Sequence, residues 1–122
     1  MANKRYRLPL IPLRGLTVFP GIVIHFDVGR PKSIAAIETA MASDRLVFLS
    51  YQKDSFIENP TREDISKIGV IAEVKQILRL PDGNLRVLIE GVSRAAITRY
   101  YDGESFIEAS VHQKEEDRKS VV

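Results

Sequence analysis

The chain has 122 residues, a hydrophobic fraction of 44% and a net charge of +2, which is the size and composition of a single globular domain. Because it contains no cysteine, disulfide bonds and thiolate metal sites are excluded, in agreement with a reducing compartment such as the cytoplasm. No apolar run approaches the length of about 18 residues that predicts a membrane span, and the basic residues are too scattered to predict a nucleic-acid surface.

The first segment with a structural pattern is residues 8–14. We expect residues 1–7 before it, which include Lys4, Arg5 and Arg7, to form a mobile tail. Pro9 and Pro12 have no backbone N–H to donate to a β-ladder. Residues 8–14 are therefore predicted to pair only at an edge or through alternate residues, as a rim strand.

Two further strands are predicted at residues 22–28 and 46–51. The second is a short apolar run with β-branched and aromatic members, which is typical of a well-buried strand. The first alternates apolar and other residues, which indicates one buried face. The side chains expected on that face are Ile22, Ile24, Phe26 and Val28.

A helix is predicted between these strands, from Pro31 to Ser43. Gly29 breaks the preceding strand, and Pro31 suits a first helical turn, where its missing N–H costs nothing. At about 100° per residue, one stripe of the helix is apolar and Lys32 lies opposite it. The apolar stripe contains Ile34, Ile37, Ala40 and Met41.

Residues 53–64 are polar, contain Pro60 and show no periodicity, so they are predicted to be a loop. Two apolar residues, Phe56 and Ile57, lie in its middle. They have two interpretations: a small cluster tucked under the loop, or a surface exposed for a partner.

A β-hairpin is predicted from residues 68–80 and 85–92 around Pro81–Asn84, since proline presets the first turn residue and Gly83 tolerates a positive φ. A four-residue loop places Leu78 opposite Val87, whereas a three-residue loop places it opposite Arg86, so alternation favours four. The same register predicts two further opposed pairs, Lys75 with Glu90 and Arg79 with Arg86.

The last predicted pair of strands is 95–101 and 106–112 around Asp102–Glu104. Residues 114–122 are charged and unpatterned, as expected of a linker toward a further region. The folded domain is therefore expected to cover residues 8–113.

No catalytic, cofactor-binding or metal-binding set is predicted. Residues 29–33 keep a Lys-Ser pair but lack the earlier glycine of a phosphate loop. Ser93 lies in a strand pattern rather than a hydrolase elbow. His25 and His112 have no metal-spaced partner and are interpreted as ordinary rim residues.

An ordered set of short motifs nevertheless resembles a known family. Pro12-Leu13-Arg14, Phe19-Pro20, Val28-Gly29-Arg30 and Ser33 occur in this order, followed by residues 69–74, the Pro81–Asn84 turn and residues 90–95. The order over about residues 8 to 113 resembles the N-terminal region of ATP-dependent Lon proteases.

This resemblance implies a fold that is mostly β with one α-helix, a compact pseudo-barrel of about six strands similar to the PUA fold. It implies an N-terminal fragment that recognises and holds unfolded or damaged polypeptides and supports a homohexamer. ATP, Mg²⁺ and the serine endopeptidase activity are expected only in regions absent from these residues, so the chain itself is not expected to be an enzyme. The expected location is cytoplasmic, without membrane or nucleic-acid binding.

Capture of an apolar segment by a groove or a free sheet edge is the expected mechanism. The candidate contact residues are Leu8, Leu10, Leu13, Phe56 and Ile57. The residues that match the family pattern are interpreted as architectural: Pro12, Arg14, Pro20, Gly29, Arg30, Ser33 and Gly83.

Two alternatives remain open. The chain could be a stand-alone domain of the same type without protease parts. It could also be an RNA-binding module, which the PUA-like architecture and the pI of about 9.0 suggest by analogy of fold. Arg94, Arg99, Tyr100 and Tyr101 are the residues that such a module would use.

Overall fold

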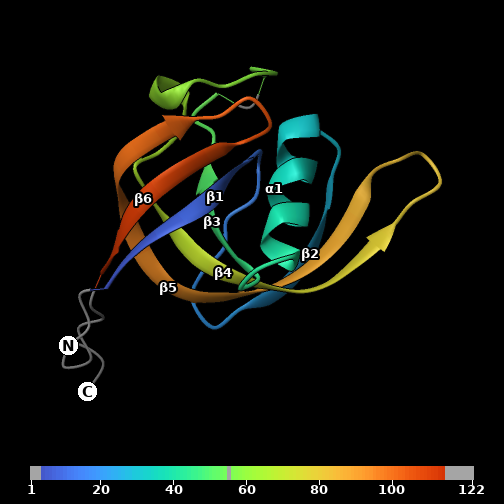
Figure 1. The fold of residues 1–122 in the computed structure, drawn as a ribbon, viewed down its shortest axis with the longest axis horizontal. Coiled ribbons are helices and arrows are strands. Elements are labelled where there is room, and N and C mark those ends of the chain that lie inside the picture. The colour runs from blue at the N-terminus through green and yellow to red at the C-terminus, as the bar shows by residue number, and fades with distance from the viewer. Residues whose placement is uncertain (1–3, 55, 115–122) are drawn as a thin grey trace.

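The computed structural model describes residues 4–54 and 56–114 (Figure 1). The described residues are mostly β-strand with one α-helix, which confirms the predicted fold class. A single 3-10 turn, η1 (Arg62–Asp64), interrupts the long loop. The elements are β1 (Arg5–Leu13), β2 (Val23–Val28), α1 (Pro31–Met41), β3 (Leu46–Tyr51), β4 (Ile68–Arg79), β5 (Leu85–Asp102) and β6 (Ile107–Gln113).

The six strands form one sheet that closes into a ring. The strand order is β2-β5-β4-β3-β1-β6, and β5 also pairs with β6, so five strands make the ring and β2 extends it. This closure depends on the 18-residue length of β5, whose first part pairs with β2 and whose last part pairs with β6. The two strands predicted at 85–92 and 95–101 are therefore one continuous strand.

β1 lies inside the sheet order, so the prediction of a rim strand is wrong. Its first half, to Leu10, pairs antiparallel with β6, and its second half, from Leu10, pairs parallel with β3. Only Leu10 has partners on both sides, so Pro9 and Pro12 each face one neighbouring strand. The two prolines are tolerated because neither lies where both sides of the strand are paired.

Two apolar clusters fill the two faces of the sheet. One lies under α1 and includes Ile37 and Leu49. The other brings together side chains from all five ring strands and includes Phe48 and Ile71. Neighbouring residues of β3 therefore point into different clusters, as the alternation of a strand requires, and β3 is the buried strand that the sequence predicts.

Helix α1 packs through the predicted apolar stripe. Ile37 and Ala40 are buried, while Ile34 and Met41 are half-buried at the margins of the same cluster. Lys32 is exposed. Figure 1 shows α1 between the ring of strands and the β4–β5 hairpin, which extends past the helix.

The β4–β5 turn differs from the prediction. Leu80 N donates to Asn84 O at 2.9 Å and Gly83 N donates to Leu80 O at 3.0 Å, which closes a three-residue loop. Gly83 has the expected positive φ, 92°, and a loop of this kind is a type I turn followed by a left-handed glycine.

Leu78 consequently opposes Arg86, and the prediction that it opposes Val87 is wrong. A β-bulge between Val74 and Gln76 shifts the alternation of β4, so Leu78 points outward with 57% of its surface exposed. Ile77 takes the place opposite the buried Val87.

The two arginines of this hairpin form ion pairs with different elements, Arg79 with helix α1 and Arg86 with its cross-strand neighbour Asp27 on β2. Arg79 opposes Leu85 rather than Arg86. Arg79 Nη2 lies 2.9 Å from Glu38 Oε2 on α1, and Arg86 Nε lies 2.8 Å from Asp27 Oδ1 on β2.

Lys75 lies at the bulge, and Glu73 rather than Lys75 is the direct partner of Glu90. The Nζ of Lys75 lies 3.3 Å from Glu90 Oε1 and 3.1 Å from Glu73 Oε1. The predicted ion pair is thus present without the predicted register, and Lys75 separates two like charges.

The outer limits of the fold differ slightly from the expected ones. β1 begins at Arg5 because Arg5 to Arg7 pair with β6, so these residues are not part of a tail. Residues 1–3 lie outside the described residues. Of the expected linker 114–122, Lys114 is described, and its N–H donates to Arg94 O at 2.8 Å.

Candidate functional site

A groove of about 740 Å³ lies where the end of β1, the β2–α1 junction and the loop before η1 meet. Leu13, Leu16, Phe26 and Val28 contribute apolar side chains to its lining. The polar and charged residues that line it are Arg14, Asp27, Arg30, Ser33, Glu58 and Asn59.

Several of the residues with the family pattern converge on this groove. Pro12, Arg14, Gly29, Arg30 and Ser33 all line it, although they come from two segments of the sequence. A Cβ on Gly29 would lie 2.9 Å from Asn84 Oδ1, so glycine lets the hairpin turn approach the β2–α1 junction. The fold therefore brings residues of the family pattern from two segments of the sequence to one groove.

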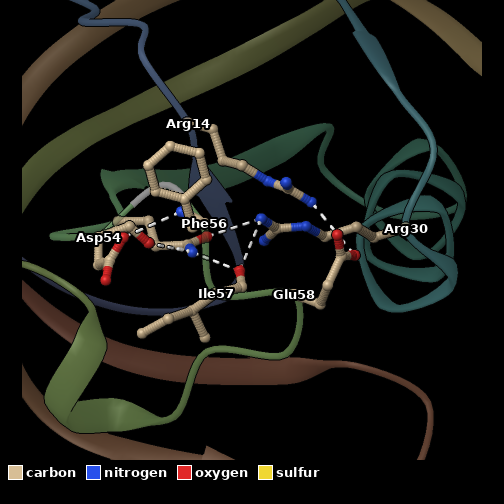
Figure 2. Close-up of polar contacts among 7 residues, drawn as sticks. Arg14, Arg30, Asp54, Phe56, Ile57 and Glu58 are labelled. Atoms are coloured by element: carbon tan, nitrogen blue, oxygen red, sulfur yellow. Dashed lines mark hydrogen bonds and ion pairs between the residues drawn. The ribbon is translucent and has the colours of Figure 1, made fainter.

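The Arg30 side chain binds the loop that precedes η1. Arg30 is the N-cap residue of α1, and its Nη2 donates to Gln52 Oε1 at 2.7 Å and to Ile57 O at 3.5 Å (Figure 2). Burial lowers the pKa of the Arg30 guanidinium, the positive charge of Arg14 lowers it further, and Glu58 raises it. Among the described residues, the buried Nη1 has no hydrogen-bond partner.

Gln52 connects this arginine to the loop and to the sheet. Its backbone N–H donates to Leu13 O at 2.7 Å, and its side-chain Nε2 donates to Asp54 O at 2.6 Å and to Ile57 O. Only 4% of the Gln52 surface is exposed. The sequence interpretation missed this residue, and the available signal was a polar side chain directly after a buried strand.

Arg14 and Glu58 form the outer wall of the groove. Arg14 Nη2 lies 3.6 Å from Glu58 Oε1, and the Glu58 side chain is 77% exposed (Figure 2). An exposed ion pair at this distance contributes little stability. Glu58 is therefore a loosely held carboxylate beside two guanidinium groups.

The two apolar residues of the loop take different positions. Phe56 is 89% exposed, and its N–H donates to Asp54 Oδ1 at 3.0 Å. Ile57 is half-buried, with its carbonyl held by Gln52 and Arg30. The alternative of a tucked cluster fits Ile57, whereas exposure for a partner fits Phe56.

The other three candidate contacts lie in the core. Leu8, Leu10 and Leu13 are 2%, 2% and 6% exposed, so their side chains face the apolar clusters, and Leu13 also lines the groove. The expectation of a free edge at β1 placed them on the surface, but β1 lies between β3 and β6 in the sheet, and the side chains of Leu8 and Leu10 point into the apolar cluster that contains Phe48. Pro20 and Gly83 lie in the turns before β2 and between β4 and β5.

A second apolar surface lies at the start of β2. Phe19, Ile22, Val23 and Val92 are 44% to 54% exposed. Backbone bonds join their segments: Gly21 N donates to Gly91 O at 2.8 Å and Gly91 N to Ile22 O at 2.9 Å. Sequence alternation placed Ile22 on the buried face, but β2 begins only at Val23.

Ser93 is buried within β5, as its interpretation as a structural residue requires. His25 is exposed on β2 and His112 is half-buried on β6. Residues 4–54 and 56–114 contain no group of three or more His, Cys, Asp or Glu side chains that could hold a metal ion. In the same residues, no helix is long and apolar enough to cross a membrane.

The fold and the groove define a small β-barrel domain with one covering helix. The family model of the ATP-dependent protease La (LON) substrate-binding domain matches residues 7–121. The Lon protease of Clostridium acetobutylicum is 58% identical over 118 residues, and that of Heliobacterium modesticaldum is 54% identical over 114. These alignments cover 96% and 93% of this chain but 15% and 14% of the relatives.

Solved structures share the fold. The N-terminal domain of Mycobacterium avium complex Lon protease has a TM-score of 0.74 at 22% identity, over 92% of this chain and 56% of that one. A Lon N-terminal domain protein from Xanthomonas campestris has a TM-score of 0.69 at 17% identity, over 92% of this chain and 62% of that one. The chain therefore belongs to the family of Lon protease N-terminal substrate-binding domains, as its sequence motifs predict.

Proposed function

We propose that this chain is the N-terminal part of an ATP-dependent Lon-type protease and that it recognises and holds unfolded or damaged polypeptides. The chain spans about 15% of the length of the curated relatives that it matches. Hexamer assembly and a cytoplasmic location belong to the same proposal. ATP and Mg²⁺ would bind other regions of such a protein, and we expect the chain by itself to cleave neither ATP nor peptides.

The observation that carries this proposal is the position of Phe56. A phenylalanine side chain that is 89% exposed gains free energy when an apolar segment covers it. It lies in the loop that borders the groove, whose lining includes the apolar side chains of Leu16 and Phe26. An extended polypeptide that contacts Phe56 would therefore meet further apolar surface in the groove.

Binding by one copy is expected to be weak, in the micromolar range or weaker. A single small groove offers less contact than a standard interface, and ordering an unfolded chain opposes association. Several copies around a ring would multiply such contacts through effective concentration. Weak binding by each copy also permits release of the held segment.

The test is fluorescence anisotropy with a labelled unfolded protein, reduced and carboxymethylated α-lactalbumin. We expect Phe56→Ser to reduce its affinity several-fold, with no change in thermal unfolding, because Phe56 contributes little buried surface. Leu78→Ser removes another exposed large apolar side chain, on the β4–β5 hairpin, and is the matched control. Equal affinity of both variants and the parent would remove Phe56 from the site.

The second apolar surface is tested in the same assay. Val23→Ser and Val92→Ser act on exposed side chains at the start of β2 and the middle of β5. If only these variants lose polypeptide binding, the substrate surface lies there rather than at the groove. If neither set matters, the proposal that this domain holds polypeptides through its apolar surface is wrong.

RNA binding remains a second candidate because of one specific hollow of about 430 Å³. Arg62, Lys67, Arg99 and Tyr100 line it, and Arg62 Cζ lies 5.7 Å from the centre of the Tyr100 ring. Basic side chains beside an aromatic ring suit a phosphate and a base. Such binding would weaken steeply with salt, which distinguishes it from apolar capture.

A further inference from the structure

Arg30 is a half-buried cation with neutral partners. Its hydrogen bonds go to the Gln52 side-chain oxygen and the Ile57 carbonyl, and among the described residues it has no salt bridge. Its Nη1 is buried without a hydrogen-bond partner in that part of the chain. A guanidinium removed from water without a carboxylate partner is unfavourable, so this position favours an incoming negative charge.

The acidic residues that line the groove are already accounted for. Asp27 is held by Arg86, whose Nε and Nη2 donate to its two carboxylate oxygens at 2.8 and 3.2 Å. Glu58 is the other acid, and it pairs with Arg14 rather than with Arg30. Its Oε1 lies 3.6 Å from Arg14 Nη2, and its side chain is largely exposed. With Asp27 and Glu58 each paired to another arginine, Arg30 forms no ion pair with a carboxylate among the described residues.

Glu58 is close enough to influence Arg30, since it raises the pKa of that guanidinium. Figure 2 shows the Glu58 carboxylate beside the guanidinium groups of Arg14 and Arg30. Glu58 belongs to an irregular stretch of loop, so its position shows that an acidic side chain on an irregular backbone reaches this place. The cost of moving it is small because its side chain is mostly in water.

We propose that the groove binds an apolar polypeptide segment that carries an acidic side chain, and that Glu58 occupies the place of that carboxylate until the substrate displaces it. The substrate carboxylate then bonds to Arg14 and Arg30, while its apolar neighbours cover Leu16 and Phe26. This inference rests on the proposed function, which it deepens by assigning a substrate class. Glu58 thereby competes with the substrate for the same two cations.

The experiment uses the chain and two labelled synthetic peptides that are apolar except for one central residue, glutamate in one and glutamine in the other. Both peptides are amidated at the C-terminus, so the side chain is the only carboxylate. Anisotropy titrations should give tighter binding of the glutamate peptide, on the order of fivefold, which corresponds to one favourable exposed ion pair. This preference should shrink as salt is raised.

Glu58→Gln is the decisive variant because the side chain is exposed and the fold does not depend on it. It should increase affinity for the glutamate peptide severalfold and leave the glutamine peptide unchanged. Glu63→Gln removes an exposed acid outside the groove lining and should change neither affinity. Arg30→Gln should abolish the preference, and Arg30→Lys, which keeps the charge, should retain part of it.

The outcomes separate the inference from the proposed function. If neither peptide binds, the proposed function fails and the inference fails with it. If both bind equally to the parent chain, or if Glu58→Gln gives no gain for the glutamate peptide, the inference is overturned and polypeptide capture remains. If a glutamine peptide with a free C-terminus binds best, the groove selects a chain terminus, and our assignment of an acidic side chain is wrong.

Discussion

The substitution Ile37→Ala tests how the helix is fixed to the sheet. Ile37 is 0% exposed and lies in the cluster between α1 and the sheet. Losing about 0.8 kcal/mol of transfer free energy for each of the three carbons removed gives about 2.4 kcal/mol. The residual cavity adds to this, while the higher helix propensity of alanine returns a few tenths of a kcal/mol. We therefore expect a loss of about 3 kcal/mol.

The free energy of unfolding is measured by urea denaturation with linear extrapolation, and the slope should be unchanged. A loss of this size lowers the melting temperature by about 12 °C for a domain of this length, at about 4 °C per kcal/mol. Lys32→Ala, on the exposed side of the same helix, is the control and should change stability by less than about 0.5 kcal/mol. A loss below about 1 kcal/mol for Ile37→Ala, or a larger loss for Lys32→Ala, would refute this packing.

Three further predictions concern the sheet and its turns. Gly83→Ala should cost about 1 kcal/mol in urea denaturation, because φ at this position is 92° and alanine is strained there; a cost near zero would contradict the left-handed turn. Gly91→Ala should cost about 1–3 kcal/mol, because its Cβ would lie 2.3 Å from the backbone oxygen of Phe19, and a neutral result would mean that the turn before β2 moves freely. The hydrogen bond from Arg86 lowers the pKa of Asp27, so at acidic pH the native state binds fewer protons than the unfolded state. The pair therefore stabilises the native state fully above the ordinary pKa of 3.8, and this stabilisation is lost as the pH falls through the lowered pKa. Asp27→Asn should therefore flatten the acid side of the curve of stability against pH, and an unchanged curve would show that the pair contributes nothing.

Elements with a clear local pattern were predictable from the sequence. The alternation in β2 and the apolar stripe of α1 each reflect one buried face, and the apolar run of β3 reflects a strand that is buried on both faces. These patterns are readable in the sequence because burial selects apolar residues at the spacing of each element. The place of β1 and the β4–β5 register were not predictable in this way. β1 tolerates its prolines because its first half pairs with β6 and its second half with β3, so neither proline lies between two paired strands. The bulge at Lys75 reverses which side chains of β4 face the core.

The candidate site shows a similar division. Sequence motifs identified Arg14 and Arg30 as members of a family pattern, but their meeting with Glu58 depends on how the long loop folds back over the end of β1. Gln52 holds that loop, and no motif marks it. The burial of Leu13 follows from its packing in the apolar cluster under α1, with side chains that are far away in the sequence.

The most direct test of polypeptide capture is to measure binding of the unfolded protein and of a single-stranded RNA to the same sample while salt rises from about 50 to about 200 mM. Apolar capture predicts micromolar binding of the polypeptide that changes little over this range. RNA binding through about six or more phosphate contacts would weaken by at least about a thousandfold. Polypeptide binding that is steady in salt and reduced by Phe56→Ser would agree with the proposed function. Salt-sensitive RNA binding, with no polypeptide binding at any salt concentration, would contradict it.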